Sequence, residues 1–472
     1  MIRTANHLRS FLDHVRKPLL SVPLAQQQYP AWSAAIRTHS SSTTTTKTNN
    51  HTTTTTAPPH RVLIIGAGAI GLRTALEFSN RGIDVCLRAP TSPTDPTVCS
   101  SGAGGFWMPF RCDDARVDGW ARDTLDEFYN LLQLQQQEQQ DNNKPLVELL
   151  PAISLFRDHA GPTLDESEVE LGLVDSSTTT TTTTPPSLPA WTRDERLQFQ
   201  HVTVEMLEWQ NTVMKMRIPT KHELFQAGYR HAWLWQSPVA DSPAVLNYYL
   251  QQLLQSQQGN HDVNVETGRY YESMDEVQQV ASDLGCDAIV NCTGLGARDL
   301  VEDEQELVAG RGAMLMLDRA SCQRRPEVLG NNNNNNENTQ DAIITVSEPP
   351  WGSDSHPAYL IPRGDCIVVG GTVLKGDEET AVRKEERQKL WQNAHHLGID
   401  TGLYNHESSN DDRVQEWVGF RPLRNTVRCG FDNDNDNNQS SAARVFHSYG
   451  HGGSGWTVHV GVAKECVRQF LG

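Results

Sequence analysis

A glycine-rich turn between an apolar run and a helix-like segment constrains the fold of this chain more than any other feature. Val62–Ile65 is apolar throughout, Gly66–Gly71 reads Gly-Ala-Gly-Ala-Ile-Gly, and Ile70–Arg81 has helical composition. A second apolar run, Ile83–Leu87, follows, so the segment predicts a β-α-β unit. The N-terminus of such a helix offers unpaired N–H groups to the phosphates of a dinucleotide. The sequence therefore predicts a dinucleotide-binding domain.

The glycines of this loop have separate expected tasks. Gly66 permits the tight turn, Gly68 lets the backbone approach a pyrophosphate, and Gly71 lets helix and strand pack closely. An acidic residue at the end of the second strand would bind ribose hydroxyls, but Arg88 stands there instead. Arg88 can face a phosphate or stack on adenine, or it can lie in a solvated loop. The motif by itself does not distinguish NAD from FAD.

Later segments predict that the nucleotide domain is discontinuous, with polar loops inserted between its parts. The expected elements are strands at Asp287–Cys292, Ala313–Leu317, Ala342–Val346 and Cys366–Val369, a helix at Val382–His396, and a loop followed by a helix over Gly450–Phe470. Low-complexity runs are expected to be surface loops, because they cannot bury enough apolar area to offset their ordering entropy. These runs are Thr52–Thr56, Gln135–Asn143, Thr178–Thr184, Asn331–Asn336 and Asp432–Gln439.

Composition excludes several classes of function. The formal net charge is -18, which leaves no electrostatic footprint for nucleic-acid binding. No apolar run approaches the roughly 18 residues needed for a membrane span. The nine cysteines are scattered and lack a C-x-x-C pair, so neither a disulfide framework nor a metal site is expected. The cysteine pattern favours a reducing compartment.

Residues 1–59 differ from the rest and are expected to form a disordered or targeting extension. They are basic, poor in acids and rich in Ser and Thr, and apolar residues recur at helical spacing from Ile2 to Leu19. This pattern resembles a transit peptide of a mitochondrion or another organelle. A disordered extension or a misassigned gene start are the alternatives. The C-terminal Gln469–Gly472 lacks an S-K-L type peroxisomal signal.

Several blocks, in order, resemble the D-amino acid oxidase family over roughly residues 60 to 470. They are Gly102–Phe110 with its W-x-P segment, Asp287–Gly296, Gly310–Gly312, Pro357–Arg363 followed by Gly370–Thr372, Gly419–Arg424, and Tyr449–Gly455. The resemblance implies an α/β fold with a Rossmann-like FAD-binding domain, assembled from residues 60–115, 262–312 and 413–472. It also implies a substrate domain with an antiparallel or mixed β-sheet, from residues 116–261 and 313–412.

The resemblance implies FAD as the cofactor, with the flavin ring at the junction of the two domains. The residues expected at FAD are Gly66, Ala67, Gly68, Ile70, Gly71, Arg88, Gly104, Gly105, Phe106, Tyr270, Thr293, Gly294, Arg311, Gly452, Gly453, Ser454, Gly455, Trp456 and Thr457. No metal is expected, because hydride transfer to flavin N5 needs alignment and a dry site rather than a protein nucleophile.

Three residues are expected to handle a D-amino acid substrate. Arg421 is expected to bind the substrate carboxylate through its guanidinium fork, and a structural salt bridge is the alternative. The resemblance implies that the Tyr359 hydroxyl also binds the carboxylate, and that the Gly453 carbonyl accepts from the amine. Tyr359 could instead pack in the core, and Gly453 could be part of a flexible turn.

Two departures from the family pattern bear on specificity. Relatives often carry a second tyrosine near the substrate, whereas Ser355 and Val373 stand at the candidate positions. D-Aspartate oxidases place an arginine where Val373 lies, so the expected activity is oxidation of neutral, apolar D-amino acids by molecular oxygen. The products would be 2-oxo acids, ammonia and hydrogen peroxide. D-Aspartate, glycine or sarcosine oxidation, a flavin dehydrogenase, and a flavin-binding protein without turnover remain alternatives, and a homodimer is left open.

Overall fold

The computed structural model describes residues 58–109, 114–137, 144–157, 188–206, 217–256, 261–301, 304–323, 325, 340–346, 349, 351, 356–404, 411–432 and 442–472. The expected extension up to residue 57 lies outside these residues, as do Ser355, Phe110, the threonine and asparagine runs, and most of the stretches Gln135–Asn143 and Asp432–Gln439.

Five strands form the parallel part of the sheet, in the order β14-β7-β1-β2-β6. Strands buried on both faces are typically continuous apolar runs, which is why β1 and β2 were recognisable in the sequence. Helix α2 connects these two strands, as expected for a β-α-β unit. The strands come from three distant parts of the chain and confirm the Rossmann-like, discontinuous architecture. Their bounds are β1 Arg61–Ile65, β2 Asp84–Ala89, β6 Val263–Thr267, β7 Ala288–Asn291 and β14 Arg444–His451.

The second part of the sheet is mixed. Its order is β4-β5-β3-β9-β10-β11-β8-β13, and every neighbouring pair is antiparallel except β3 and β9. Strand β13 pairs with both β8 and β14, so the two parts form one continuous sheet. The bounds are β3 Val147–Phe156, β4 Gln200–Thr203, β5 His231–Ala240, β8 Val308–Asp318, β9 Ile343–Val346, β10 Ala358–Arg363, β11 Cys366–Gly370, β12 Leu374–Lys375 and β13 Val414–Phe431.

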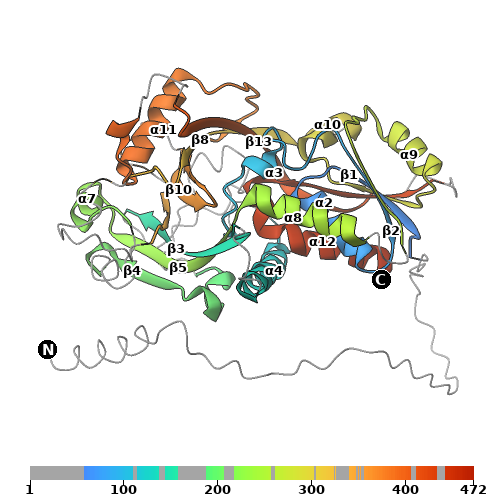
Figure 1. The fold of residues 1–472 in the computed structure, drawn as a ribbon, viewed down its shortest axis with the longest axis horizontal. Coiled ribbons are helices and arrows are strands. Elements are labelled where there is room, and N and C mark those ends of the chain that lie inside the picture. Colours follow the sequence, from blue (N-terminus) through green and yellow to red (C-terminus); the bar gives the residue numbers. More distant parts are fainter. Residues whose placement is uncertain are drawn as a thin grey trace, which may run out of the picture. The chain divides into compact units, whose positions relative to one another are not determined.

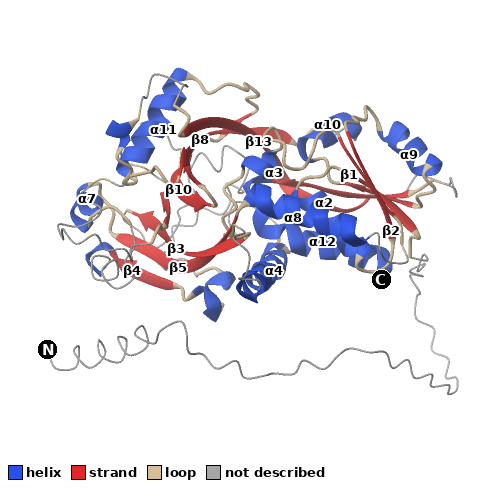
Figure 2. Ribbon diagram, viewed as in Figure 1, coloured by secondary structure: helices blue, strands red, loops and turns tan. Residues whose placement is uncertain are grey.

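Helices α2, α8, α4 and α12 pack together beside the parallel strands (Figures 1 and 2). Helix α8 contacts α2, and α4 contacts α12, although the expected boundaries assign α4 and α8 to the substrate domain. Those boundaries stay a prediction, since residues 55–472 form one compact unit. The α-helices are α2 Ala69–Ser79, α3 Cys99–Gly102, α4 Val117–Gln137, α7 Lys221–Gln226, α8 Ser242–Gln255, α9 Met274–Asp283, α10 Ala297–Leu300, α11 Lys384–His396 and α12 Gly455–Leu471.

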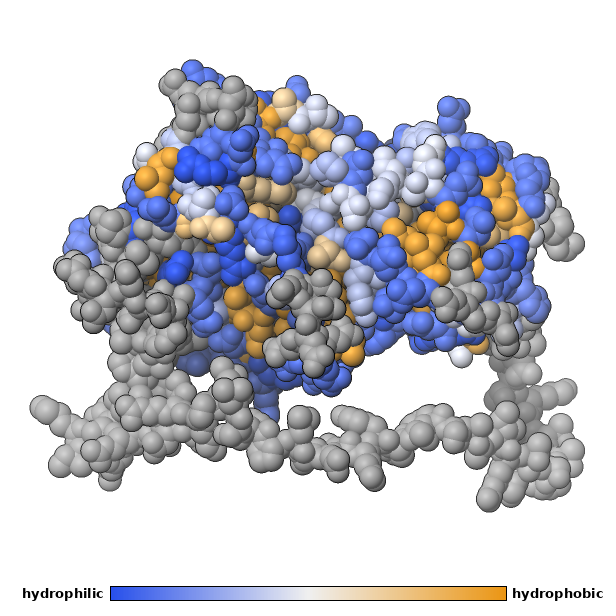
Figure 3. All heavy atoms as spheres, in the orientation of Figure 1, coloured by the Kyte–Doolittle hydropathy of each residue, from blue (hydrophilic) through white to orange (hydrophobic). Residues whose placement is uncertain are grey.

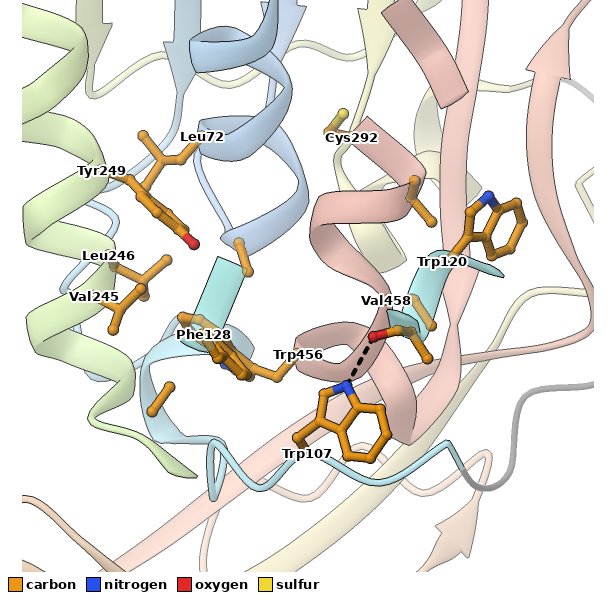
Figure 4. Packing of buried hydrophobic residues seen from close by; sticks show 14 of the residues in the cluster. Leu72, Trp107, Trp120, Phe128, Val245, Leu246, Tyr249, Cys292, Trp456 and Val458 are labelled. Atoms are coloured by element: carbon orange, nitrogen blue, oxygen red, sulfur yellow. Dashed lines mark hydrogen bonds between the residues drawn. The ribbon is translucent and has the colours of Figure 1, made fainter. Parts of the chain in front are cut away.

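Large apolar and aromatic side chains fill the space between these helices. In Figure 4, Leu72 of α2 and Tyr249 of α8 point toward one another, and both are buried. Trp107 lies at the edge of the same cluster, and its indole N–H donates to the Ala121 carbonyl at 2.9 Å. Burial of side chains of this size contributes about 2–3 kcal/mol each. This packing holds the N-termini of α2 and α12 in place.

The surface is consistent with the acidic, polar composition. Figure 3 shows a face on which hydrophilic residues predominate and hydrophobic residues lie in separate patches. Among the described residues, no helix has the length and apolar character that a membrane span requires.

Candidate active site

A cavity of about 720 Å³ lies where the parallel and mixed parts of the sheet meet. Its walls come from the glycine loop after β1, the ends of β2 and β7, the N-terminus of α12, and the strands β3, β9, β10 and β13. A volume of this size is within the range of cofactor and ligand sites.

The glycine loop has the geometry that close packing demands. Gly66 has φ +102°, and a Cβ there would lie 2.4 Å from the Cys292 carbonyl oxygen. A Cβ on Gly71 would lie 1.8 Å from the Gly66 carbonyl oxygen. Gly68 caps α2 without a side-chain hydrogen bond of its own, and it lines the cavity together with Ala69 and Ile70 of that helix end. The Ala69 N–H donates to the Ser100 hydroxyl at 3.2 Å. Gly71 itself does not line the cavity, and its task is to bring helix and strand together.

The N-terminus of α12 is the second backbone element at the cavity. Gly452, Gly453, Gly455, Trp456 and Thr457 line it, whereas the side chain of Ser454 is buried away from it. The Trp456 indole donates to the Ser100 carbonyl at 2.9 Å. The Thr457 hydroxyl donates to the Met108 carbonyl at 3.0 Å and accepts from the Met108 N–H at 3.2 Å. These bonds hold the helix end against the residue 100–108 segment.

Arg421 and Tyr359 meet at the other side of the cavity. The Arg421 guanidinium donates to the Tyr359 hydroxyl at 3.4 Å through Nη2, and to the Thr372 carbonyl at 3.2 Å through Nη1. Arg421 has no carboxylate partner among the described residues, so the alternative of a structural salt bridge is not observed there. A Cβ on Gly312 would lie 2.2 Å from Arg421 Nη1, and one on Gly453 would lie 3.7 Å from Arg421 Cδ. Arg421, Tyr359 and Gly453 therefore lie together.

Most other residues expected at the cofactor also line the cavity. They are Ala67, Ile70, Gly104, Gly105, Phe106, Tyr270, Thr293 and Gly294. Tyr270 is half exposed, and its hydroxyl donates to Asp299 at 2.7 Å.

Arg88 and Arg311 are not among the residues that line the cavity, so their expected contact with the cofactor stays a prediction. Arg88 is buried within β2, opposite Glu266 of β6, with which it forms an ion pair at 3.0 Å. The parallel pairing of β2 with β6 places the Glu266 carboxylate next to the Arg88 guanidinium. Arg311 is fully buried, pairs with Glu386, and donates to the Ala381 carbonyl, so it anchors the start of α11.

Several cavity residues carry no local signal in the sequence. Ser154 and Phe156 of β3, Thr345 of β9, Trp233 of β5, and Trp191 line the substrate side. They come from segments far apart in the chain, and only the strand register brings them together. Val147–Phe156 itself is almost continuously apolar and buried, so no alternation of polar and apolar residues marks Ser154 or Phe156 as facing a cavity.

The residues present fit FAD. A Cβ added at Gly294 or Gly455 would meet no protein atom within 4 Å, so both glycines present bare backbone at the cavity. His451 Nε2 is buried at the cavity wall and has no hydrogen-bond partner among the described residues. Buried polar atoms without a partner are costly, so a bound polar ligand would satisfy them. Two helix N-termini provide the positive dipole ends that phosphates and a reduced flavin favour.

A buried histidine behind the cavity predicts a pH dependence of stability. The Nδ1 atom of His459 lies 3.0 Å from the Trp456 carbonyl oxygen, and its Nε2 atom lies 3.0 Å from the Tyr249 hydroxyl. These contacts fit a neutral ring that donates through Nδ1 to the carbonyl and accepts through Nε2. Burial, with Arg73 nearby, lowers the pKa of His459 to about 3, from an ordinary value of 6.5. The unfolded chain therefore binds the proton first, and stability present above pH 6.5 is lost as the pH falls toward 3. We expect the free energy of unfolding to fall by roughly 1.4 kcal/mol per pH unit because of this one group.

Thermal unfolding between pH 7.5 and pH 4.5 measures this effect. His459→Gln should flatten the dependence relative to the unmodified protein, whereas His222→Gln, on an exposed part of α7, should not. An equal slope in the unmodified protein and in His459→Gln would contradict the assignment.

The comparisons with known proteins agree with this geometry. Residues 61–469 match the DAO family, described as FAD-dependent oxidoreductases. A D-amino-acid oxidase of Dictyostelium discoideum is 23% identical, over 86% of this chain and 90% of that protein. D-aspartate oxidase 1 of Caenorhabditis elegans is 22% identical, over 86% and 96%. The crystal structure of glycine oxidase from Geobacillus kaustophilus has the same fold, with a TM-score of 0.56 and 14% identity over 87% of this chain and 95% of that one. Because the family match spans nearly all of the chain beyond residue 60, the chain belongs to the DAO family of FAD-dependent oxidoreductases.

Proposed function

We propose that this FAD-dependent oxidoreductase oxidises D-amino acids to 2-oxo acids, releasing ammonia and hydrogen peroxide. The observation that carries the proposal is the Arg421 guanidinium, which lines the cavity beside the Tyr359 hydroxyl and has no carboxylate partner among the described residues. A forked cationic donor in such a position is suited to a carboxylate ligand. Relatives named D-amino-acid oxidase, aligned over most of both chains, add support.

The protein's own contribution is binding and orientation. FAD, when bound, would supply the two-electron acceptor for the hydride of the substrate α carbon, with oxygen as the final acceptor. Arg421 and Tyr359 would hold the carboxylate, and the Gly453 carbonyl would accept a hydrogen bond from the amine. Two fixed ends of the substrate orient its Cα–H bond, and the apolar walls of the cavity exclude water.

The charge of the cavity favours neutral substrates over D-aspartate. Val373 lines the cavity and offers no charge to a side-chain carboxylate. Among the described lining residues the arginines are Arg421 and Arg269. Arg269 lies beside the end of β2, where its backbone N–H donates to the Ala89 carbonyl. His451 is neutral near pH 7, because burial lowers its pKa to about 4. A second carboxylate would therefore be desolvated without a partner, which is costly.

An anaerobic absorbance experiment on the purified flavoprotein tests the proposal. D-Methionine is expected to bleach the flavin absorbance, L-methionine is the matched control that should not, and admitted air should restore the colour with formation of hydrogen peroxide. Faster bleaching by D-aspartate than by D-alanine, D-methionine or D-phenylalanine would overturn the neutral preference. Bleaching by glycine or sarcosine alone would assign a different amine oxidase, and bleaching without reoxidation by air would assign a dehydrogenase.

A further inference from the structure

The substrate side of the cavity is built on one row of residues that crosses four strands. Trp233 of β5 pairs with Ser154 of β3, Ser154 with Thr345 of β9, and Thr345 with Tyr359 of β10. Residues directly opposite one another in a sheet project from the same face, and all four line the cavity. The carboxylate-binding Tyr359 is thus the last member of a row that leads away from Arg421.

The strand spacing sets the scale of this row. Neighbouring strands lie about 4.8 Å apart, so the backbone of Thr345 is about 5 Å from that of Tyr359, Ser154 about 10 Å, and Trp233 about 14 Å.

Ser154 and Thr345 form a hydroxyl pair at the cavity wall. Their hydroxyls are hydrogen-bonded to each other, and the Thr345 hydroxyl donates to the Ile153 carbonyl at 3.4 Å. The bond between the two hydroxyls can run in either direction. When Thr345 donates to the Ile153 carbonyl, Ser154 donates to Thr345 and the Ser154 oxygen keeps only lone pairs. Ser154 is 7% exposed, so its free lone pairs sit in a largely dry wall. Such an oxygen accepts from an N–H or O–H donor and disfavours a carboxylate.

Aromatic rings surround the far end of the row. The Trp233 ring lies 5.2 Å from Phe156 and 6.2 Å from Trp191 by centroid distance, and all three line the cavity. Phe156 is two residues beyond Ser154 and therefore projects from the same sheet face. Aromatic rings attract one another at such separations beyond what their area burial contributes, so this end of the cavity is suited to a flat aromatic group.

We propose that Ser154, Thr345 and the Trp191–Trp233–Phe156 cluster form a side-chain subsite that selects D-amino acids with an aromatic ring bearing an N–H or O–H donor, such as an indole. The inference rests on the proposed function, because it takes Arg421 and Tyr359 as the carboxylate anchor. The ring lies in the aromatic cluster, and its donor is bound by the Ser154 oxygen.

Steady-state rates with D-tryptophan, D-phenylalanine and D-alanine test the subsite. The unmodified protein should have its highest kcat/KM with D-tryptophan. Ser154→Ala should lower kcat/KM for D-tryptophan about tenfold. For D-phenylalanine, which lacks the donor, kcat/KM should stay within about twofold of the value for the unmodified protein. Thr345→Val should behave similarly, because it frees the Ser154 proton to point elsewhere, while Thr345→Ser keeps the hydroxyl and should restore the D-tryptophan preference.

Ligand binding separates failure of the subsite from failure of the proposed function. Indole-3-propionate and 3-phenylpropionate have the carboxylate and the ring but no amine, and flavin absorbance reports their dissociation constants. Ser154→Ala should raise the dissociation constant of indole-3-propionate about tenfold and that of 3-phenylpropionate little, even if no D-amino acid is oxidised. Equal losses for both acids, or a kcat/KM for D-alanine at least as high as for D-tryptophan, would overturn the subsite. Flavin that no D-amino acid reduces, with the binding preference intact, would instead overturn the oxidase activity.

Discussion

Arg421→Ala is expected to lower kcat/KM for a neutral D-amino acid by roughly 10²–10³-fold while FAD remains bound. Removing one partner of a buried charge pair costs about 3–5 kcal/mol, because the substrate carboxylate would be desolvated without a counter-charge. Arg421 donates to Tyr359 and Thr372 and contacts no carboxylate among the described residues, so its charge is available to a ligand. The loss should appear mainly in KM. Steady-state kinetics, with the flavin content measured on the same preparation, check it.

Two further variants show whether the loss of kcat/KM in Arg421→Ala comes from a missing carboxylate partner. Arg421→Lys keeps the charge but not the fork, so it should recover part of the affinity. Arg413→Ala is the matched control, because Arg413 immediately precedes the same strand β13 but does not line the cavity, and it pairs with Asp411. An unchanged KM in Arg421→Ala, or an equal loss in Arg413→Ala, would mean that the carboxylate binds elsewhere.

Gly71→Ala is expected to abolish FAD binding. The new methyl group would lie 1.8 Å from the Gly66 carbonyl oxygen and 2.8 Å from its carbon, so either α2 or the loop must move. Both contacts are with backbone, which cannot rotate away as a side chain can. Displacement of the α2 N-terminus would move the helix end that is expected to bind the FAD phosphates. The ratio of flavin to protein absorbance after purification measures the result, which we expect to be near zero even in the soluble fraction.

Gly119→Ala is the matched control for this substitution. Gly119 is exposed on helix α4, and a Cβ there would meet no atom within 4 Å. Alanine is favoured over glycine in a helix by up to about 1 kcal/mol, so this variant should keep its FAD and unfold at an equal or higher temperature. A Gly71→Ala protein with full flavin content would refute the assigned role of the loop.

Hydrophobic patterns within short segments of the sequence predicted several individual strands and helices. The apolar run Val62–Ile65 is within β1, the helix expected at Ile70–Arg81 is α2, and the helix expected at Val382–His396 is α11, each with ends shifted by a few residues. Strands β3 and β5 and helices α4 and α8 were not predicted individually. They lie between or beside low-complexity runs, where composition gives little indication of an element boundary.

The arginines show where such reasoning stops. The motif around Arg421 predicted a place beside the substrate, and the structure brings Arg421 to the cavity with Tyr359 and Gly453. Arg88 and Arg311 were expected at the cofactor on equally local grounds, yet both are bound by carboxylates from other elements. A guanidinium pairs with whichever acid the fold brings near, and the sequence around it does not name that acid.

The sequence by itself determined the glycine loop, its flanking strands and helix, and the blocks that resemble the oxidase family. These features depend on backbone stereochemistry and on residues close together in the chain. Only the tertiary structure decided the row from Trp233 to Tyr359 and the partners of Arg88 and Arg311. Strand register is set by long-range packing, since a shift of one residue turns every side chain of a strand to the other face.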